Sequence, residues 1–303
     1  MAIVYLRAIA IIFIVFHHSI STLTGWPPAD IGSHTVPEFV ITASHYAKFF
    51  GLYTFTLISG FLIGSNRPTI TYARYMYYKA KKILIPCFIS GIAYYVLFPD
   101  YIIGDPINGT HLLYLPMIFV LYMLGPILNA NITYRNSLIL LVAYFSLWGG
   151  YKIADQRFLI EGFYYMGAFI LGGYLARLKN CTVSKELIFL GFVIVLLLDT
   201  FIKSFIAICL FVVLFYLWLR VQISEEKFVQ TSIWIRSIIV ISKASMLIYI
   251  LHQFVINFIV ELYLSNHFII SLLPFMCFFL SLLIPTMIYY FYSRVKMLIK
   301  EER

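Results

Sequence analysis

Charged residues are scarce in this sequence: of its 303 residues, 12% are charged and 62% are hydrophobic. No long polar stretch interrupts the apolar sequence. A water-soluble domain needs a polar surface, so this composition excludes a soluble protein. Each helical crossing of a bilayer takes roughly 20 mostly apolar residues, and a chain of this length has room for about ten. We therefore expect an all-α, polytopic transmembrane bundle of about ten helices that forms a single integral-membrane domain over residues 1–303.

Acidic residues and cysteines are also few. The 13 acidic residues are outnumbered by 22 basic ones, which gives a net charge of +9. The basic residues are scattered through short connecting segments, so we expect membrane lipids as partners and no nucleic acid. The four cysteines have neither paired nor metal-ligand spacing, and they are Cys87, Cys181, Cys209 and Cys277. This spacing predicts no disulfide framework and no metal site.

Apolar segments follow one another along the chain, and we expect each to cross the membrane. They cover about residues 3–22, 47–65, 83–98, 111–130, 137–151, 159–176, 186–202, 204–219, 234–260 and 268–293. The helix count around residues 186–219 stays open, because two segments there are nearly continuous. With a cytoplasmic N-terminus, most basic residues lie inside, and the exceptions are Lys48, Lys152, Arg157 and Lys203. The positive-inside rule thus predicts that both termini are cytoplasmic and that residues 25–47 form an external loop.

Arg7, His17 and His18 are polar residues inside the first apolar segment. Titratable groups are unfavourable in a membrane, so each is a candidate functional group. His18 follows Arg7 by close to three helical turns, which puts both on one helix face about 16 Å apart, while His17 points elsewhere. The pair suits an anionic cofactor near Arg7 and a general base, His18, that deprotonates a sugar hydroxyl attacking a thioester. Two alternatives stay open: Arg7 snorkels to the headgroups, and His18 is a packed, hydrogen-bonded residue.

The densest basic segment lies between the second and third apolar segments, in an expected cytoplasmic loop. It contains Arg67, Arg74, Lys79, Lys81 and Lys82. Coenzyme A carries several phosphate charges and is made on the cytoplasmic side, so this loop is a candidate site for an acyl-CoA donor. Membrane topology and attraction to anionic lipids explain the same charges.

Two further segments carry candidate residues. Ser59 precedes Gly60 in the second segment, where small residues let helices approach closely, and packing is the favoured role. Ser245, Tyr249 and His252 share one face of the ninth segment, since they are four and three positions apart. His252 either contacts the acceptor, takes part in catalysis, or is a packed histidine.

A series of short motifs resembles, in order and spacing, those of the acyltransferase-3 family of membrane O-acyltransferases. The first is Arg7 and His18 with ten residues between them, in the context Leu6-Arg7-Ala8-Ile9-Ala10. The others are residues 55–63 (FTLISGFLI), 78–86 (YKAKKILIP), 111–116 (HLLYLP, followed by Tyr122 and Pro126), 169–174 (FILGGY) and 245–252 (SMLIYILH). Each motif is weak alone, and together they span nearly the whole chain.

The resemblance implies about ten membrane helices, a cytoplasmic acyl-CoA donor that is commonly acetyl-CoA, and extracytoplasmic glycan acceptors. It also implies that Arg7 and His18 are the essential pair. Donor binding would involve Arg74, Lys79 and Lys82, although Lys79 and Lys82 stand where the family has two arginines, and lysine lacks the bidentate fork. Candidate contacts to the acceptor, or residues that support the site, are Ser59, Tyr114, Tyr249 and His252.

The sequence thus predicts an acetyl-CoA-dependent sugar O-acetyltransferase of the cell envelope, placed in a bacterial cytoplasmic (inner) membrane. Its acceptor is expected to be a polysaccharide or lipid-linked sugar. No G-x-S-x-G elbow is present, which favours direct transfer over an acyl-enzyme. The alternatives are a polytopic transporter or exporter of a lipid-linked glycan and an assembly partner in polysaccharide synthesis. Both explain intramembrane polar residues without catalysis.

Overall fold

The computed structural model describes residues 1–24, 36–65, 71–99, 111–130, 157–177, 184, 186–191, 193, 205–225, 233–266 and 272–301. Every regular element in these ranges is a helix, which confirms the all-α class. The expected crossing at 137–151 and most of the one at 186–202 lie outside the described residues. The total of about ten helices and the cytoplasmic termini therefore stay predictions.

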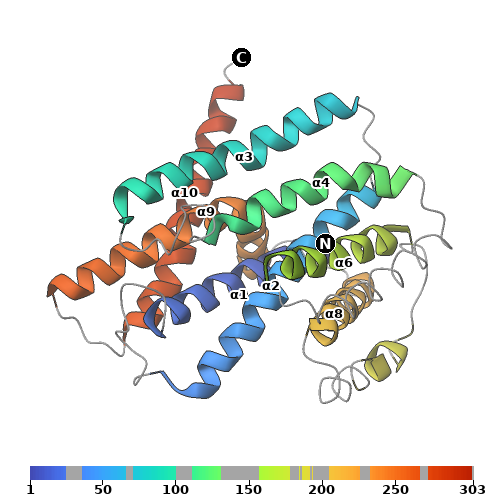
Figure 1. The fold of residues 1–303 in the computed structure, drawn as a ribbon, viewed down its shortest axis with the longest axis horizontal. Helices are drawn as coiled ribbons and strands as arrows, with labels where there is room; N and C mark the ends of the chain where they lie inside the picture. The colour runs from blue at the N-terminus through green and yellow to red at the C-terminus, as the bar shows by residue number, and fades with distance from the viewer. Residues whose placement is uncertain are drawn as a thin grey trace. The chain divides into compact units, whose positions relative to one another are not determined.

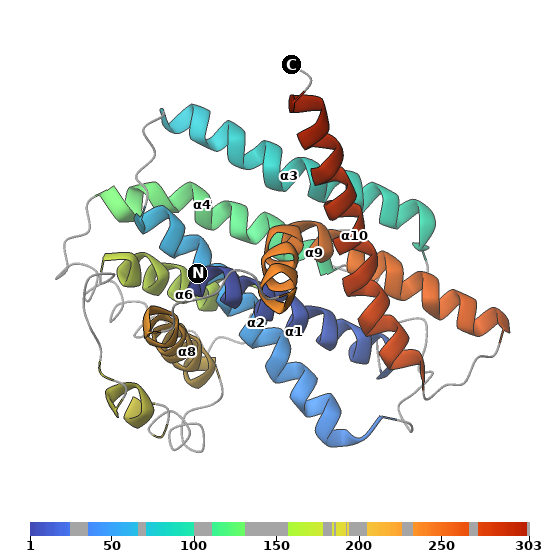
Figure 2. The ribbon, with the colours of Figure 1, turned by 180° about the vertical axis from the view of Figure 1, so that it is seen from behind.

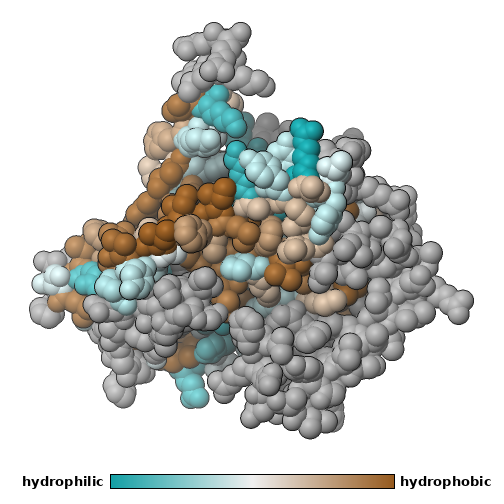
Figure 3. All heavy atoms as spheres, turned by 45° about the horizontal axis from the view of Figure 1, so that its top comes forward, coloured by the Kyte–Doolittle hydropathy of each residue, from teal (hydrophilic) through white to brown (hydrophobic). Residues whose placement is uncertain are grey.

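Five of the described helices are long and apolar enough to cross a membrane. They are α1 (Ala2–Thr24), α2 (Glu38–Ser65), α3 (Tyr72–Leu97), α9 (Ile233–Asn266) and α10 (Leu273–Glu301). The other described elements are the 3-10 helix η2 (His111–Leu113), α4 (Tyr114–Ala130), α6 (Arg157–Arg177) and α8 (Phe205–Glu225), and the last three contain shorter apolar stretches. Exposed side chains on these helices are often large and apolar, as the brown surface in Figure 3 shows. Such a surface suits contact with lipid.

Helices α2 and α3 begin well before the apolar segments that predicted them. The carbonyl of Pro37 accepts hydrogen bonds from the amides of Val40 and Ile41, so α2 begins directly after this proline. The expected loops at residues 38–47 and 72–82 are therefore wrong, because hydropathy marks the part of a helix inside the bilayer core and not its polar ends. As a result, His45 and the basic residues Arg74, Lys79 and Lys82 lie on helices.

The chain divides into two compact units. The first contains Met1–Gly51, Phe88–Leu112 and Glu226–Arg303, and the second contains Leu52–Cys87 and Leu113–Glu225. Within the first unit α1 packs against α9 and α10, which also pack against each other, and Figures 1 and 2 show these three helices meeting in both views. Within the second unit α4 packs against α6. A single domain over the whole chain stays a prediction.

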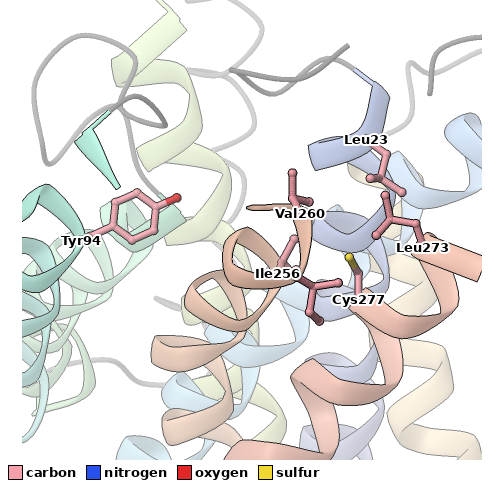
Figure 4. Close-up of a cluster of buried hydrophobic side chains, with 7 residues drawn as sticks. Leu23, Tyr94, Ile256, Val260, Leu273 and Cys277 are labelled. Carbon is pink, nitrogen blue, oxygen red and sulfur yellow. The ribbon is translucent and has the colours of Figure 1, made fainter. Parts of the chain in front are cut away.

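The core of the first unit contains a cluster of buried hydrophobic residues from four helices. Figure 4 shows Leu23 of α1, Tyr94 of α3, Ile256 and Val260 of α9 with two residues of α10. The α10 residues are Leu273 and Cys277, and the cysteine is buried and unbonded. Buried polar residues of the same helices, Thr22 of α1 with Gln253 and Asn257 of α9, are close to these apolar residues in the sequence.

Candidate functional site

His18 lies among other imidazole rings in the first unit. Its ring centroid is 5.1 Å from that of His17 and 5.0 Å from that of His252 on α9. The ring of His17 lies 5.3 Å from that of His45 on α2. We call these four residues the imidazole cluster. His45 is exposed, whereas His17, His18 and His252 are 3%, 7% and 0% exposed.

The adjacent histidines of α1 reach two different helices. Consecutive helical residues are about 100° apart around the axis, so His17 and His18 face α2 and α9 respectively. Arg7, which is half-buried, precedes His18 in the same unbroken helix, and the two therefore share a face. The structure thus keeps the sequence-predicted pair on one side of α1.

A network of buried side chains holds α1 against α9. The Thr22 hydroxyl donates to the carbonyl of His18 at 2.8 Å and accepts from the Gln253 amide at 3.1 Å. The Gln253 amide also donates to Asn257 at 2.9 Å, and Asn257 donates to the Tyr94 hydroxyl at 2.5 Å. We call Thr22, Gln253, Asn257 and Tyr94 the buried polar network. Hydrogen bonds between membrane helices oppose sliding of one helix along the other. The buried polar network therefore stabilises the position of His18 along the α1 axis relative to His252 on α9.

His252 is oriented by its own helix. Its Nδ1 lies 3.1 Å from the carbonyl oxygen of Ile248 and 2.8 Å from that of Tyr249, and both can only accept. Nδ1 therefore carries a hydrogen, and Nε2 is the acceptor of the neutral ring. The ring of Tyr249 is 5.8 Å away, and Ser281 of α10 donates to the His252 carbonyl. Two of the sequence candidates, His18 and His252, are thus in ring contact.

Lys79 and Ser59 meet at one tyrosine in the second unit. The Lys79 ammonium lies 3.6 Å from the centre of the Tyr122 ring, and the Tyr122 hydroxyl donates to Ser59 at 2.9 Å. We call Lys79, Tyr122 and Ser59 the lysine–tyrosine group. Nearby in the chain, the hydroxyls of Thr56 and Tyr114 share a hydrogen bond of 2.9 Å. Each sequence candidate here has a hydroxyl or aromatic partner.

The three expected donor-binding residues have different surroundings. Lys79 is half-buried against Tyr122, whereas Arg74 and Lys82 are exposed. The Arg74 guanidinium donates to the hydroxyl of Tyr78, one turn further along α3. Arg74 and Lys82 can therefore meet a charged ligand or headgroup without rearrangement of the core.

The packing of α2 on α6 depends on two glycines. A Cβ at Gly60 would overlap the backbone carbonyl of Phe169, and a Cβ at Gly172 would overlap that of Leu57. The helices are thus in backbone contact, as small-residue interfaces in membranes allow. This confirms the packing role expected for Gly60.

The sequence analysis placed His17 away from the face of Arg7 and His18, named Tyr122 only as part of a motif, and did not single out His45, Gln253 or Asn257. Two signals in the sequence pointed to them. Pro37 followed by Glu38 is a helix-start pattern that would have placed His45 on a helix. Gln253 and Asn257 are polar residues four apart in an apolar segment, which marks one polar face. The neighbour of Tyr122 depends on tertiary packing, and no local pattern indicates it.

Comparison with known proteins identifies the family. The model of the acyltransferase-3 family, described as an acyltransferase domain, matches residues 2–291. No curated protein and no solved structure matches the chain. Among the described residues, no group of three or more His, Cys, Asp or Glu side chains is placed to hold a metal. The described part of the chain contains five candidate membrane helices, and the family match covers nearly the whole chain. This integral membrane protein therefore belongs to the acyltransferase-3 family, and this membership supports the assignment of an acyltransferase that uses an acyl donor.

Proposed function

We propose that the protein moves an acyl group, expected to be acetyl, from cytoplasmic acyl-CoA to a hydroxyl of an extracytoplasmic glycan or lipid-linked sugar. His18 is the general base that takes the proton of the acceptor hydroxyl. Arg7 positions the donor or its thioester end. The observation that carries this proposal is the burial of His18 in ring contact with other imidazoles, on the helix face it shares with Arg7.

The proposed reaction is a direct transfer. The hydroxyl oxygen attacks the thioester carbonyl as His18 removes its proton, and the carbon–sulfur bond then breaks to release the thiolate. A neutral imidazole is the side chain suited to this step near neutral pH. Binding of both substrates in one site supplies proximity. On the donor side we propose that Lys79, with the exposed Arg74 and Lys82, attracts the phosphates of the acyl-CoA.

The proposal includes a bacterial cytoplasmic membrane with about ten crossings in one domain and both termini inside. This orientation follows from the distribution of basic residues. Membrane lipids surround the chain, and the product is an O-acetylated polysaccharide or precursor of the cell envelope.

Mass spectrometry of surface glycans tests the proposal in cells. Three strains are compared: one with the wild-type protein, one without it, and one with His18→Ala. Glycan O-acylation is expected only in the first. Equal acyl content in all three strains would exclude the function.

A transporter or glycan exporter is the rival that also explains polar residues in membrane helices. It predicts that the glycan leaves the cell at a rate that does not depend on acyl-CoA or on His18. An assembly partner predicts a phenotype that survives His18→Ala. Family membership favours the enzyme over both.

A further inference from the structure

We propose that His17 and His45 form a proton path from His18 to the surface of the first unit. The inference rests on the proposed function, in which His18 takes up a proton in every turnover. Neither residue touches the reacting atoms, so both are positioning residues for the proton.

The spacing of the imidazole cluster supports stepwise transfer. A hydrogen bond of about 2.9 Å between ring nitrogens, with the radii of the two rings added, separates ring centres by about 5 Å. The observed separations of 5.3 Å for His45–His17 and 5.1 Å for His17–His18 are close to this value. These separations therefore permit a hydrogen bond between neighbouring rings once the rings rotate so that their nitrogens face each other.

Burial gives the path its direction. His45 is exposed, while His17 and His18 are buried, so the cluster leads from the interior to the surface. On the other side of His18 lies His252, which is fully buried and whose Nδ1 proton is held by two backbone carbonyls. A proton that moves to His252 has to return, whereas His45 lies at the surface of the first unit, two helical turns from the Glu38 end of α2, where its proton can exchange with water outside the bilayer core.

The chemistry balances as follows. The hydroxyl oxygen forms a bond to the acyl carbon, the carbon–sulfur bond breaks, and its electron pair leaves on the thiolate. The hydroxyl proton passes from His18 through His17 to His45 and then to water. The thiolate takes one proton from water on its own side. His18 has then lost the proton that it took from the hydroxyl, so it is neutral for the next turnover. The leaving sulfur does not have to contact His18.

The groups that face the path are identified by their contacts. From α2, the Ser44 backbone accepts a hydrogen bond from the His17 ring and Lys48 brings a positive charge near it, and from α9, Tyr249 lies beside His252. From α10, Ser281 bonds only the backbone of His252. A charge on His17 would lie in the interior of the first unit, whereas a charge on His45 lies at its surface, where less desolvation is required.

The test measures transfer of label from radiolabelled acetyl-CoA into glycan and lipid in membranes that contain the native acceptor. His45→Ala is expected to lower kcat about tenfold with an unchanged KM for acetyl-CoA, because only proton transfer is affected. Added imidazole is expected to restore at least half of the lost rate, since it replaces an exposed ring. His17→Gln is expected to show the same loss without rescue, because the glutamine fills the buried position. Tyr46→Ala, at the exposed neighbour of His45, is the matched control and keeps the wild-type rate.

Each outcome decides between the two proposals. If wild-type membranes transfer no label, or if His18→Ala transfers label as fast as wild type, the proposed function fails and the path with it. If His18→Ala is inactive but His45→Ala keeps the wild-type kcat, only the path is overturned. A loss in His45→Ala that imidazole does not restore, at equal protein levels, also overturns the path.

Discussion

The imidazole cluster of the first unit and the lysine–tyrosine group of the second unit illustrate two ways of placing polar groups in a membrane protein. The cluster contains imidazole side chains, which can both accept and donate a proton, and they are oriented by backbone carbonyls and ring contacts. The lysine–tyrosine group contains one ammonium over an aromatic face and one hydroxyl bond. The first arrangement suits proton transfer, and the second suits the binding of charge. Substitutions in the two units should therefore affect different kinetic constants.

The largest difference is expected between His18→Ala and Ser59→Ala. Loss of a general base lowers kcat by about 10²- to 10⁴-fold. Loss of the Ser59 hydroxyl removes one hydrogen bond to Tyr122 and should change kcat less than threefold, roughly the effect of a modest interhelical bond. Initial rates of acetyl transfer in membranes measure both. Similar losses of kcat for the two variants would show that side chains of both units contribute to the chemical step.

A second comparison uses glycines in helices. Gly172→Ala should destabilise the second unit by roughly 1–3 kcal/mol, because the new methyl overlaps the Leu57 carbonyl and forces α6 away from α2. Gly91→Ala in α3 is the control, since a methyl group at this position has no neighbouring atom within 4 Å. It should be neutral or stabilising by up to ~1 kcal/mol. Unfolding by SDS in mixed micelles measures the difference.

A substitution of Lys79 tests whether the second unit affects donor binding and not the chemical step. Lys79→Met should raise the KM for acetyl-CoA about tenfold and leave kcat nearly unchanged, because a charge that attracts phosphate is lost. Lys81→Met, at the exposed position two residues later, is the control and should have a smaller effect. A fall in kcat with constant KM would place Lys79 in the chemical step instead.

The smallest effect is expected from Tyr94→Phe, which removes only the hydroxyl that accepts from Asn257. Hydrogen bonds between membrane helices contribute about 0.6 kcal/mol on average, so the loss of stability should stay below ~2 kcal/mol. Activity should not change, because the ring that remains still packs against Phe98 and Phe254. A tenfold fall in kcat with intact stability would assign Tyr94 a role in the reaction.

Much of the helical arrangement follows from the sequence, because about 20 apolar residues in a row have few other stable forms. Helices α1, α9 and α10 lie close to the segments that hydropathy predicted. The starts of α2 and α3 were missed since the residues before their apolar segments include charged and polar side chains, such as Glu38 in α2 and Arg74 in α3. The missed turns carry His45 and Lys79, so the error concerned residues of the proposed site and not the fold class.

The sequence predicts the relative positions of candidate site residues only when they lie on the same helix. Arg7 and His18 share a face because helical periodicity alone relates them. The contact of His18 with His252 joins positions more than two hundred residues apart, and that of Lys79 with Tyr122 joins two different helices. Such pairs depend on which helices become neighbours, and a single sequence does not encode this in any local pattern.

The buried polar network has a consequence for biosynthesis. Thr22 is made early in translation, whereas Gln253, which donates to it, follows 231 positions later. In hydrocarbon neither group finds water as a substitute partner, so α1 cannot reach its final state while the C-terminal part of the chain is still being made. A chain truncated before α9 would leave Thr22 of α1 without the Gln253 amide that donates to it.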